Sequence, residues 1–93
     1  MIRNTRGKIA TAIWQGRRPK GFGADLIRAA KRRLVVLDAA ESLEDLRANR
    51  GNRLEALRGN RRGQNSIRIN DQWRICFFWR DGDANEVEIV DYH

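Results

Sequence analysis

The chain has 93 residues, enough for a single domain spanning 1–93 and too few for separate catalytic and binding domains. Nineteen basic residues against twelve acidic ones give a net charge of +7, which predicts a polyanionic partner such as RNA, although a basic surface can also serve only solubility. One cysteine and one histidine exclude an internal disulfide and a zinc cluster, and no apolar run is long enough to cross a membrane. Together with an N-terminus that lacks a targeting pattern, these features lead us to expect a cytoplasmic protein without a metal or other cofactor.

The first elements are predicted to be a short edge strand at Ile2 and a helix that ends before Gly16. Asn4 or Thr5 is the expected cap of this helix, because their side-chain oxygens can accept the first free backbone N–H groups. Residues 16–23 combine glycine, proline and basic side chains and therefore predict a loop. This loop either contacts RNA or only connects two helices.

The clearest helix is predicted over residues 24–39. Apolar residues recur there at spacings of three or four and form one stripe, namely Ile27, Ala30, Leu34 and Leu37. The opposite side carries basic residues, for which ordinary solvated charge is the preferred interpretation: Arg28, Lys31 and Arg32. A shorter helix capped by Ser42 should follow and end before Gly51.

The second half of the chain predicts strands. They are expected over residues 53–57, 64–69, 72–80 and 86–92, with a two-residue hairpin turn at Asn70-Asp71 and a second turn at residues 81–83. Alternation along the third strand places Arg74 and Cys76 on one face, and Cys76 is expected to be buried. Helices followed by a three- or four-stranded antiparallel meander make an α+β fold.

Residues suited to RNA chemistry gather in this second half. The 2′-hydroxyl of RNA can attack its own phosphodiester when a base, an acid and nearby cations assist, so no metal is required. The candidates are arginines around the first turn, an arginine of the third strand and the end of the chain: Arg53, Arg58, Arg61, Arg62, Arg68, Arg74, Tyr92 and His93. Glu86 and Glu88 alternate with apolar residues and are expected to form a solvated strand face, although either can pair with Arg74 across strands. Each residue alone also has an ordinary structural explanation.

Several segments resemble the HigB toxins of the RelE superfamily. Residues 53–63, Arg-Leu-Glu-Ala-Leu-Arg-Gly-Asn-Arg-Arg-Gly, resemble the Leu-x-x-Leu-Lys-Gly-Asp-Arg segment of that family. Gln64-Asn65-Ser66-Ile67, Asn70-x-x-Trp73-Arg74-Ile75 and the closing Asp91-Tyr92-His93 continue the resemblance in order. The Asn-Arg-Leu-Glu-Ala-Leu form of residues 52–57 resembles the GraT-like branch of HigB.

The resemblance implies a RelE-like fold, with N-terminal helices packed on a small antiparallel β-sheet. It implies a type II toxin that cleaves messenger RNA in the A site of the 30S subunit, depends on the ribosome and uses no metal. The implied partner is a HigA-type helix-turn-helix antitoxin, through which alone the protein would reach operator DNA. By position, the resemblance carries over Asp91, Tyr92 and His93 as catalytic residues and Arg74 as the phosphate-stabilising residue, and Arg58 stands where the family usually has lysine.

Two departures from the family pattern bear on the mechanism. Glu55 stands where the better-known branch has histidine, so we take Glu55 as the general base and His93 as the general acid. Asn65 stands where an aromatic residue is common, which removes one stacking contact. The competing interpretation is a weakly active or non-catalytic module that binds RNA or the ribosome. A DNA-binding repressor is disfavoured, because the sequence shows no clear helix-turn-helix.

Overall fold

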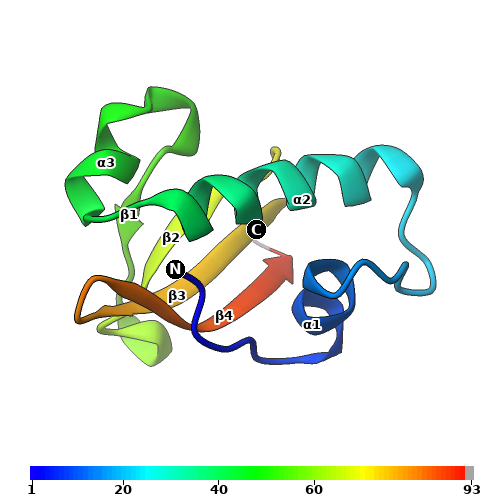
Figure 1. The fold of residues 1–93 in the computed structure, drawn as a ribbon, viewed down its shortest axis with the longest axis horizontal. Coiled ribbons are helices and arrows are strands. Elements are labelled where there is room, and N and C mark those ends of the chain that lie inside the picture. Colours follow the sequence, from blue (N-terminus) through cyan, green and yellow to red (C-terminus); the bar gives the residue numbers. More distant parts are fainter. Residues whose placement is uncertain (92–93) are drawn as a thin grey trace.

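A computed structural model describes residues 1–91 and shows helices packed on one side of an antiparallel sheet (Figure 1). The helices are α1 (Lys8–Trp14), α2 (Ala24–Ala39) and α3 (Leu43–Ala48), with short 3₁₀ turns η1 (Arg50–Asn52) and η2 (Gly59–Arg61). The strands are β1 (Glu55–Ala56), β2 (Asn65–Arg68), β3 (Trp73–Arg80) and β4 (Asp83–Asp91). Their order in the sheet is β1-β2-β3-β4, and all neighbours are antiparallel. The predicted α+β fold is confirmed, as are the helix over residues 24–39 and the cap at Ser42.

The core lies between the sheet and helices α1 and α2. The buried residues of α2 are Ala30, Leu34 and Leu37, so three of the four predicted stripe residues are buried. They pack in one cluster with the inward-facing strand residues Ile67, Ile75, Phe77, Val87 and Ile89 and with Ala10 and Ile13 of α1. Alternate strand residues therefore point to the other face of the sheet. We call that other face the outer face.

The N-terminal cap of α1 differs from the prediction. The helix begins after Gly7, which makes no side-chain hydrogen bond, rather than after Asn4 or Thr5. These two residues are used elsewhere. The Asn4 side-chain oxygen accepts the Glu86 N–H at 2.6 Å, and the Thr5 hydroxyl lies 2.7 Å from that of Thr11. The segment preceding α1 is thus held against β4 instead of capping the helix.

The N-terminal segment runs beside the outer edge of β4. Ile2 and Thr5 form isolated parallel bridges to Ala84 and Val87, so the edge strand predicted at Ile2 is reduced to these two contacts. Arg3 and the terminal amino group both contact the carboxylate of Asp83, at 2.8 and 3.3 Å. The hydrogen bond from Arg3 lowers the pKa of Asp83, and this ion pair holds the N-terminal segment against the start of β4.

The two predicted hairpin turns, between β2 and β3 and between β3 and β4, differ in length. Asp81 and Gly82 form a two-residue turn with positive φ at both residues, which matches the right-handed twist of the strands, and β4 therefore begins at Asp83 rather than residue 86. The turn predicted at Asn70-Asp71 is longer than two residues. Arg68 pairs with Arg74, and the side-chain oxygen of Asn70 accepts N–H groups from both Gln72 and Trp73.

A bulge in β4 changes which side chains reach each face. Cys76 pairs with Glu88 and Phe78 pairs with Asn85, so two residues of β4 lie opposite one residue of β3. Glu86, with φ of 51°, is one of these two residues. The extra residue allows Ala84 and Val87 both to be buried in the core and places Glu88 on the outer face beside Cys76.

Removing the Ser42 cap should lower stability without altering the outer face. The Ser42 hydroxyl accepts the Asp45 N–H at 3.2 Å, and the Asp45 carboxylate accepts the Ser42 N–H in return. We expect Ser42→Ala to reduce the free energy of unfolding by about 1 kcal/mol. Urea denaturation checks this, with Glu41→Gln at the neighbouring exposed side chain as the control. An unchanged midpoint would contradict the assigned cap.

Candidate functional site

The outer face of the sheet brings charged and polar side chains from all four strands into two adjacent rows. The strand registers place Glu55, Ser66, Cys76 and Glu88 side by side across the sheet, and Arg68, Arg74 and Val90 in the next row. α1 and α2 pack on the opposite face of the sheet, so neither covers these rows. The order and the register of the strands therefore assemble this surface.

Arg74 is a buried arginine at the centre of the outer face, held by hydrogen bonds to neighbouring protein groups. Its side chain is only 10% exposed, and it lies on the central strand β3. Its Nε donates to the Ser66 hydroxyl at 2.8 Å, and its Nη2 donates to the Arg53 carbonyl at 2.6 Å. These bonds fix the guanidinium plane, because a planar fork held at two points cannot rotate. The alternative in which Arg74 pairs with Glu86 or Glu88 across strands is not what the structure shows.

The Arg53 carbonyl is itself held in place by a buried amide. Arg53 adopts a left-handed conformation with φ of 46° directly after η1. The preceding residue, Asn52, is fully buried and donates from its side chain to the Leu46 carbonyl at 3.0 Å, while its oxygen accepts from Arg33 of α2 at 2.6 Å. The helical layer thus supports the loop that contacts Arg74.

Glu55 lies beside Arg74 at the rim of a small hollow. One carboxylate oxygen of Glu55 is 4.0 Å from Nη2 of Arg74, and about half of its side chain is exposed. The hollow measures about 290 Å³, and its walls include Arg58 and Arg61. A carboxylate that faces solvent and lies between guanidinium groups can accept a proton from a bound hydroxyl whose phosphate those groups hold.

Glu88 is the member of the site that sequence reasoning missed. Instead of forming a solvated strand face, it is partly buried and accepts a hydrogen bond from Arg61 at 2.9 Å. Arg61 also donates to Gln64 at 3.2 Å, and the bond to Glu88 raises the pKa of its guanidinium. Glu86, two residues earlier in β4, pairs instead with Arg6 and Arg80. Only the bulge distinguishes the two glutamates, and the sequence carries no clear signal of it.

Cys76 forms the floor between these charges. It is fully buried, as predicted, and burial raises the pKa of its thiol. Glu55 and Glu88 lie in the same row as Cys76, and each is next to an arginine, Arg74 for Glu55 and Arg61 for Glu88. The neutral thiol supplies small apolar volume there.

The remaining predicted residues are spread around this centre. Arg62 is exposed at the end of η2, and Arg68, in the same row as Arg74, contacts Asp71. Asp91 ends the described part of β4, where it pairs in register with Trp73 and accepts a hydrogen bond from Gln72 at 3.0 Å. Tyr92 and His93 lie outside the described residues.

Two further findings bear on ligands and surroundings. Within residues 1–91, histidine, cysteine and acidic side chains do not gather in threes that could hold a metal ion. In the same part of the chain, no helix has the length and apolar character that crossing a bilayer requires.

Comparisons with known proteins agree with this architecture. A family model described as the RelE-like toxin of type II toxin-antitoxin system HigB matches residues 13–93. Toxin HigB-1 of Vibrio cholerae is 53% identical over 53 residues, which are 57% of this chain and 56% of that toxin. Endoribonuclease HigB of Proteus vulgaris is 31% identical over 94 residues, covering 100% of both chains. The chain therefore belongs to the HigB family of RelE-like toxins of type II toxin–antitoxin systems.

Proposed function

We propose that this protein is an endoribonuclease that cleaves messenger RNA on the ribosome without a metal ion. The observation that carries the proposal is the outer face of the sheet, where the carboxylate of Glu55 lies 4.0 Å from the fixed guanidinium of Arg74. The hollow beside it is lined by two further arginines. The name of the Proteus relative, endoribonuclease HigB, supports the same activity.

In the proposed reaction, Glu55 takes the proton of a ribose 2′-hydroxyl. The freed oxygen attacks the adjacent phosphorus, and the bond from phosphorus to the 5′-oxygen breaks. His93 then gives a proton to that leaving oxygen, and Arg74 stabilises the charge that builds up on the phosphate. Tyr92 and Asp91 are proposed to complete the catalytic set, following the family ending Asp91-Tyr92-His93.

The arginines around the face are proposed to hold RNA and ribosomal phosphates. These residues are Arg53, Arg58, Arg61, Arg62 and Arg68, which lie on β2 or on the segments that flank β1. Arginine suits this role because its fork binds phosphate with two hydrogen bonds. Glu88 is proposed as a positioning residue that fixes Arg61 above the row.

Family membership implies an antitoxin partner, and we propose that it is a HigA-type helix-turn-helix protein. Operator DNA would then be reached only through that partner. We also place the chain in the GraT-like branch, on the form of residues 52–57 with Glu55. The lone buried cysteine fits a reducing compartment such as the cytoplasm.

The second candidate function is a module that binds RNA or the ribosome without cutting. The burial of Arg74 and its hydrogen bonds to protein oxygens favour it, because a guanidinium used in this way also serves as structural support.

A message that lacks the attacking 2′-hydroxyl distinguishes RNA cleavage from RNA binding without cleavage. Ribosomes programmed with messenger RNA carrying ribose throughout should be cut at the A-site codon. The same message with one 2′-deoxynucleotide at the cleaved position should resist cutting while still binding the protein. Cleavage of the deoxy message would contradict 2′-hydroxyl attack, and absence of cleavage in both messages would support the binding module.

Substitution of Glu88 tests its positioning role. Glu88→Gln removes the charge that holds Arg61, so we expect a loss of about 2- to 5-fold in kcat, the value of a partly exposed ion pair of roughly 1 kcal/mol. KM for the programmed ribosome should stay level or fall, because Arg61 becomes available to phosphate. Single-turnover kinetics measure both values. Glu86→Gln, on the same strand but paired elsewhere, is the matched control. Equal effects of the two changes would contradict the assignment.

A further inference from the structure

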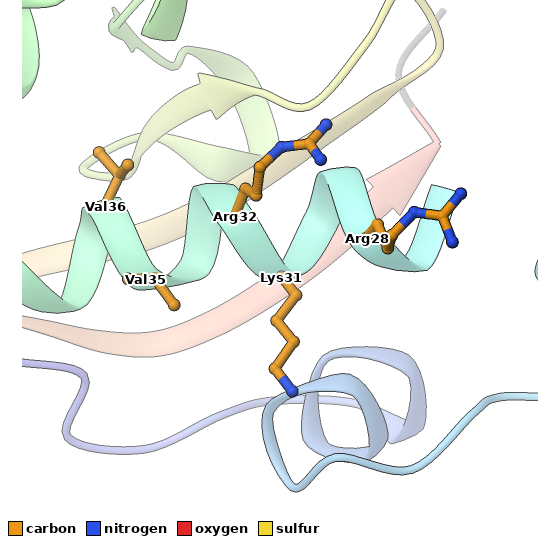
Figure 2. A pocket seen from close by; sticks show the side chains of 5 residues that line it. All are labelled: Arg28, Lys31, Arg32, Val35 and Val36. Atoms are coloured by element: carbon orange, nitrogen blue, oxygen red, sulfur yellow. The ribbon is translucent and has the colours of Figure 1, made fainter. Parts of the chain in front are cut away.

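The outward side of α2 carries a hollow that combines basic and apolar side chains. Five residues from successive turns line it, as Figure 2 shows: Arg28, Lys31, Arg32, Val35 and Val36. The hollow measures about 540 Å³. Val35 is 53% exposed, and Met1 is the only other large hydrophobic residue so exposed in residues 1–91. Val35 and Val36 together, with basic side chains around them, make an apolar surface with a charged rim, which is typical of a protein interaction site.

A second hollow extends this surface toward the sheet. It measures about 270 Å³ and shares Arg32 and Val36 with the first. Its other walls are Ala29, Arg33 and Ile69, the last of these in the connection between β2 and β3. The two hollows together form a groove along α2, which we call the α2 groove. Among the described residues that line it, none is acidic.

The charges of the α2 groove are largely uncompensated within the chain. Arg28 contacts Asp25, one turn earlier on the helix. Lys31 and Arg32 form no ion pair with any residue between 1 and 91, and α2 has no acidic residue between Asp25 and Asp38. A partner that fills the groove would therefore bury valine side chains and meet positive charge at the rim.

We propose that the α2 groove docks an acidic amphipathic helix of the antitoxin. Apolar residues on one face of such a helix would rest on Val35 and Val36, and its flanking carboxylates would meet Lys31 and Arg32. RNA is the less suitable occupant, because a phosphate backbone gains nothing from exposed valine. The proposal rests on membership of a type II toxin family, which implies a protein antitoxin, and it does not require RNA cleavage.

The location of the groove has a consequence for neutralisation. α2 packs on the core face of the sheet through Leu34 and Leu37, whereas Arg74 lies on the outer face. A helix bound in the α2 groove therefore leaves the Arg74 row uncovered. Binding of the antitoxin and access to the catalytic residues are then separable by substitution.

Binding of the purified cognate antitoxin to the full chain tests the proposal. Val35→Glu and Arg32→Glu should each weaken antitoxin binding about tenfold or more. The first puts a charge where apolar residues of the partner rest, and the second puts a negative charge where its carboxylates dock. Arg18→Glu makes the same charge change at an exposed residue outside the groove and should alter affinity by about twofold at most. Thermal unfolding of each variant, with Val35→Ala as a milder change, separates loss of binding from loss of folding.

Two results would overturn the proposal. One is antitoxin affinity equal to wild type in both groove variants. The other is a fall in binding of a short single-stranded RNA by Arg32→Glu with antitoxin binding intact, which would make the groove an RNA surface. Cleavage by each variant without antitoxin is measured in parallel. Absence of cleavage even by the wild type would contradict the proposed function and leave the antitoxin result standing.

Discussion

Replacement of Arg74 by alanine is expected to reduce cleavage of ribosome-bound messenger RNA about 10²- to 10³-fold, the usual cost of removing one preorganised donor from a charged transition state. The structure gives Arg74 two hydrogen bonds that fix its guanidinium beside Glu55, so the charge is already in place when the phosphate arrives. Single-turnover cleavage on programmed ribosomes measures the effect.

Two companion variants keep that result interpretable. Arg74→Ala leaves the Ser66 hydroxyl and the Arg53 carbonyl without this donor, at a cost of about 1–3 kcal/mol each where no water replaces it. Arg74→Lys keeps the charge without the fork and should recover part of the rate. Ser66→Ala removes one hydrogen bond to the guanidinium but not its charge. If Arg74→Ala stays folded and cleaves at the wild-type rate, Arg74 has no role in the reaction.

Loss of either proposed proton-transfer group should have the second large effect. We expect Glu55→Gln and His93→Ala each to slow the chemical step by about 10²- to 10⁴-fold, with little change in binding to the ribosome. Glu55→Gln keeps the size of the side chain and its place beside Arg74, so its effect isolates the loss of the base. Cleavage rates at saturating enzyme, together with sedimentation of the protein with ribosomes, separate chemistry from binding.

The pair of results discriminates between assignments. If Glu55→Gln leaves cleavage unchanged and His93→Ala abolishes it, Glu55 is not the base. If neither change affects the rate while Arg74→Ala does, the proton transfers belong to other groups. Glu41→Gln is the matched control, because it makes the same change as Glu55→Gln at an exposed carboxylate that belongs to neither row of the outer face.

Local patterns of the sequence predicted most of the fold. The apolar stripe through Ala30, Leu34 and Leu37 predicted the long helix correctly, because a helix that buries one face repeats apolar residues every three or four positions. The cap at Ser42 and the turn at Asp81-Gly82 were equally local. The prediction that failed at the N-terminus is instructive, since Asn4 and Thr5 are good caps whose side chains are engaged by contacts with Glu86 and Thr11 instead.

The site was only partly predictable, because its geometry depends on strand register. Alternation along β3 placed Arg74 on the outer face, and the resemblance to HigB pointed to Glu55. The role of Glu88 depends on its contact with Arg61, which lies 27 residues away in the sequence, and the separation of Glu86 from the site depends on the bulge, which shifts the alternation of β4 by one residue. No local pattern of alternating apolar and polar residues records such a shift. The role of Ser66 could not be predicted either, because it depends on the hydrogen bond that its hydroxyl accepts from Arg74 on the neighbouring strand.

Photocrosslinking from the A-site codon tests most directly whether the outer face of the sheet meets the message. Ribosomes programmed with 4-thiouridine in that codon would be bound to the His93→Ala protein, irradiated, and analysed by mass spectrometry of the crosslinked peptides. We expect crosslinks to residues 53–62, to the β3 peptide that contains Arg74, and to the chain end at residues 91–93. Crosslinks confined to α2 or to the loop over residues 16–23 would contradict it.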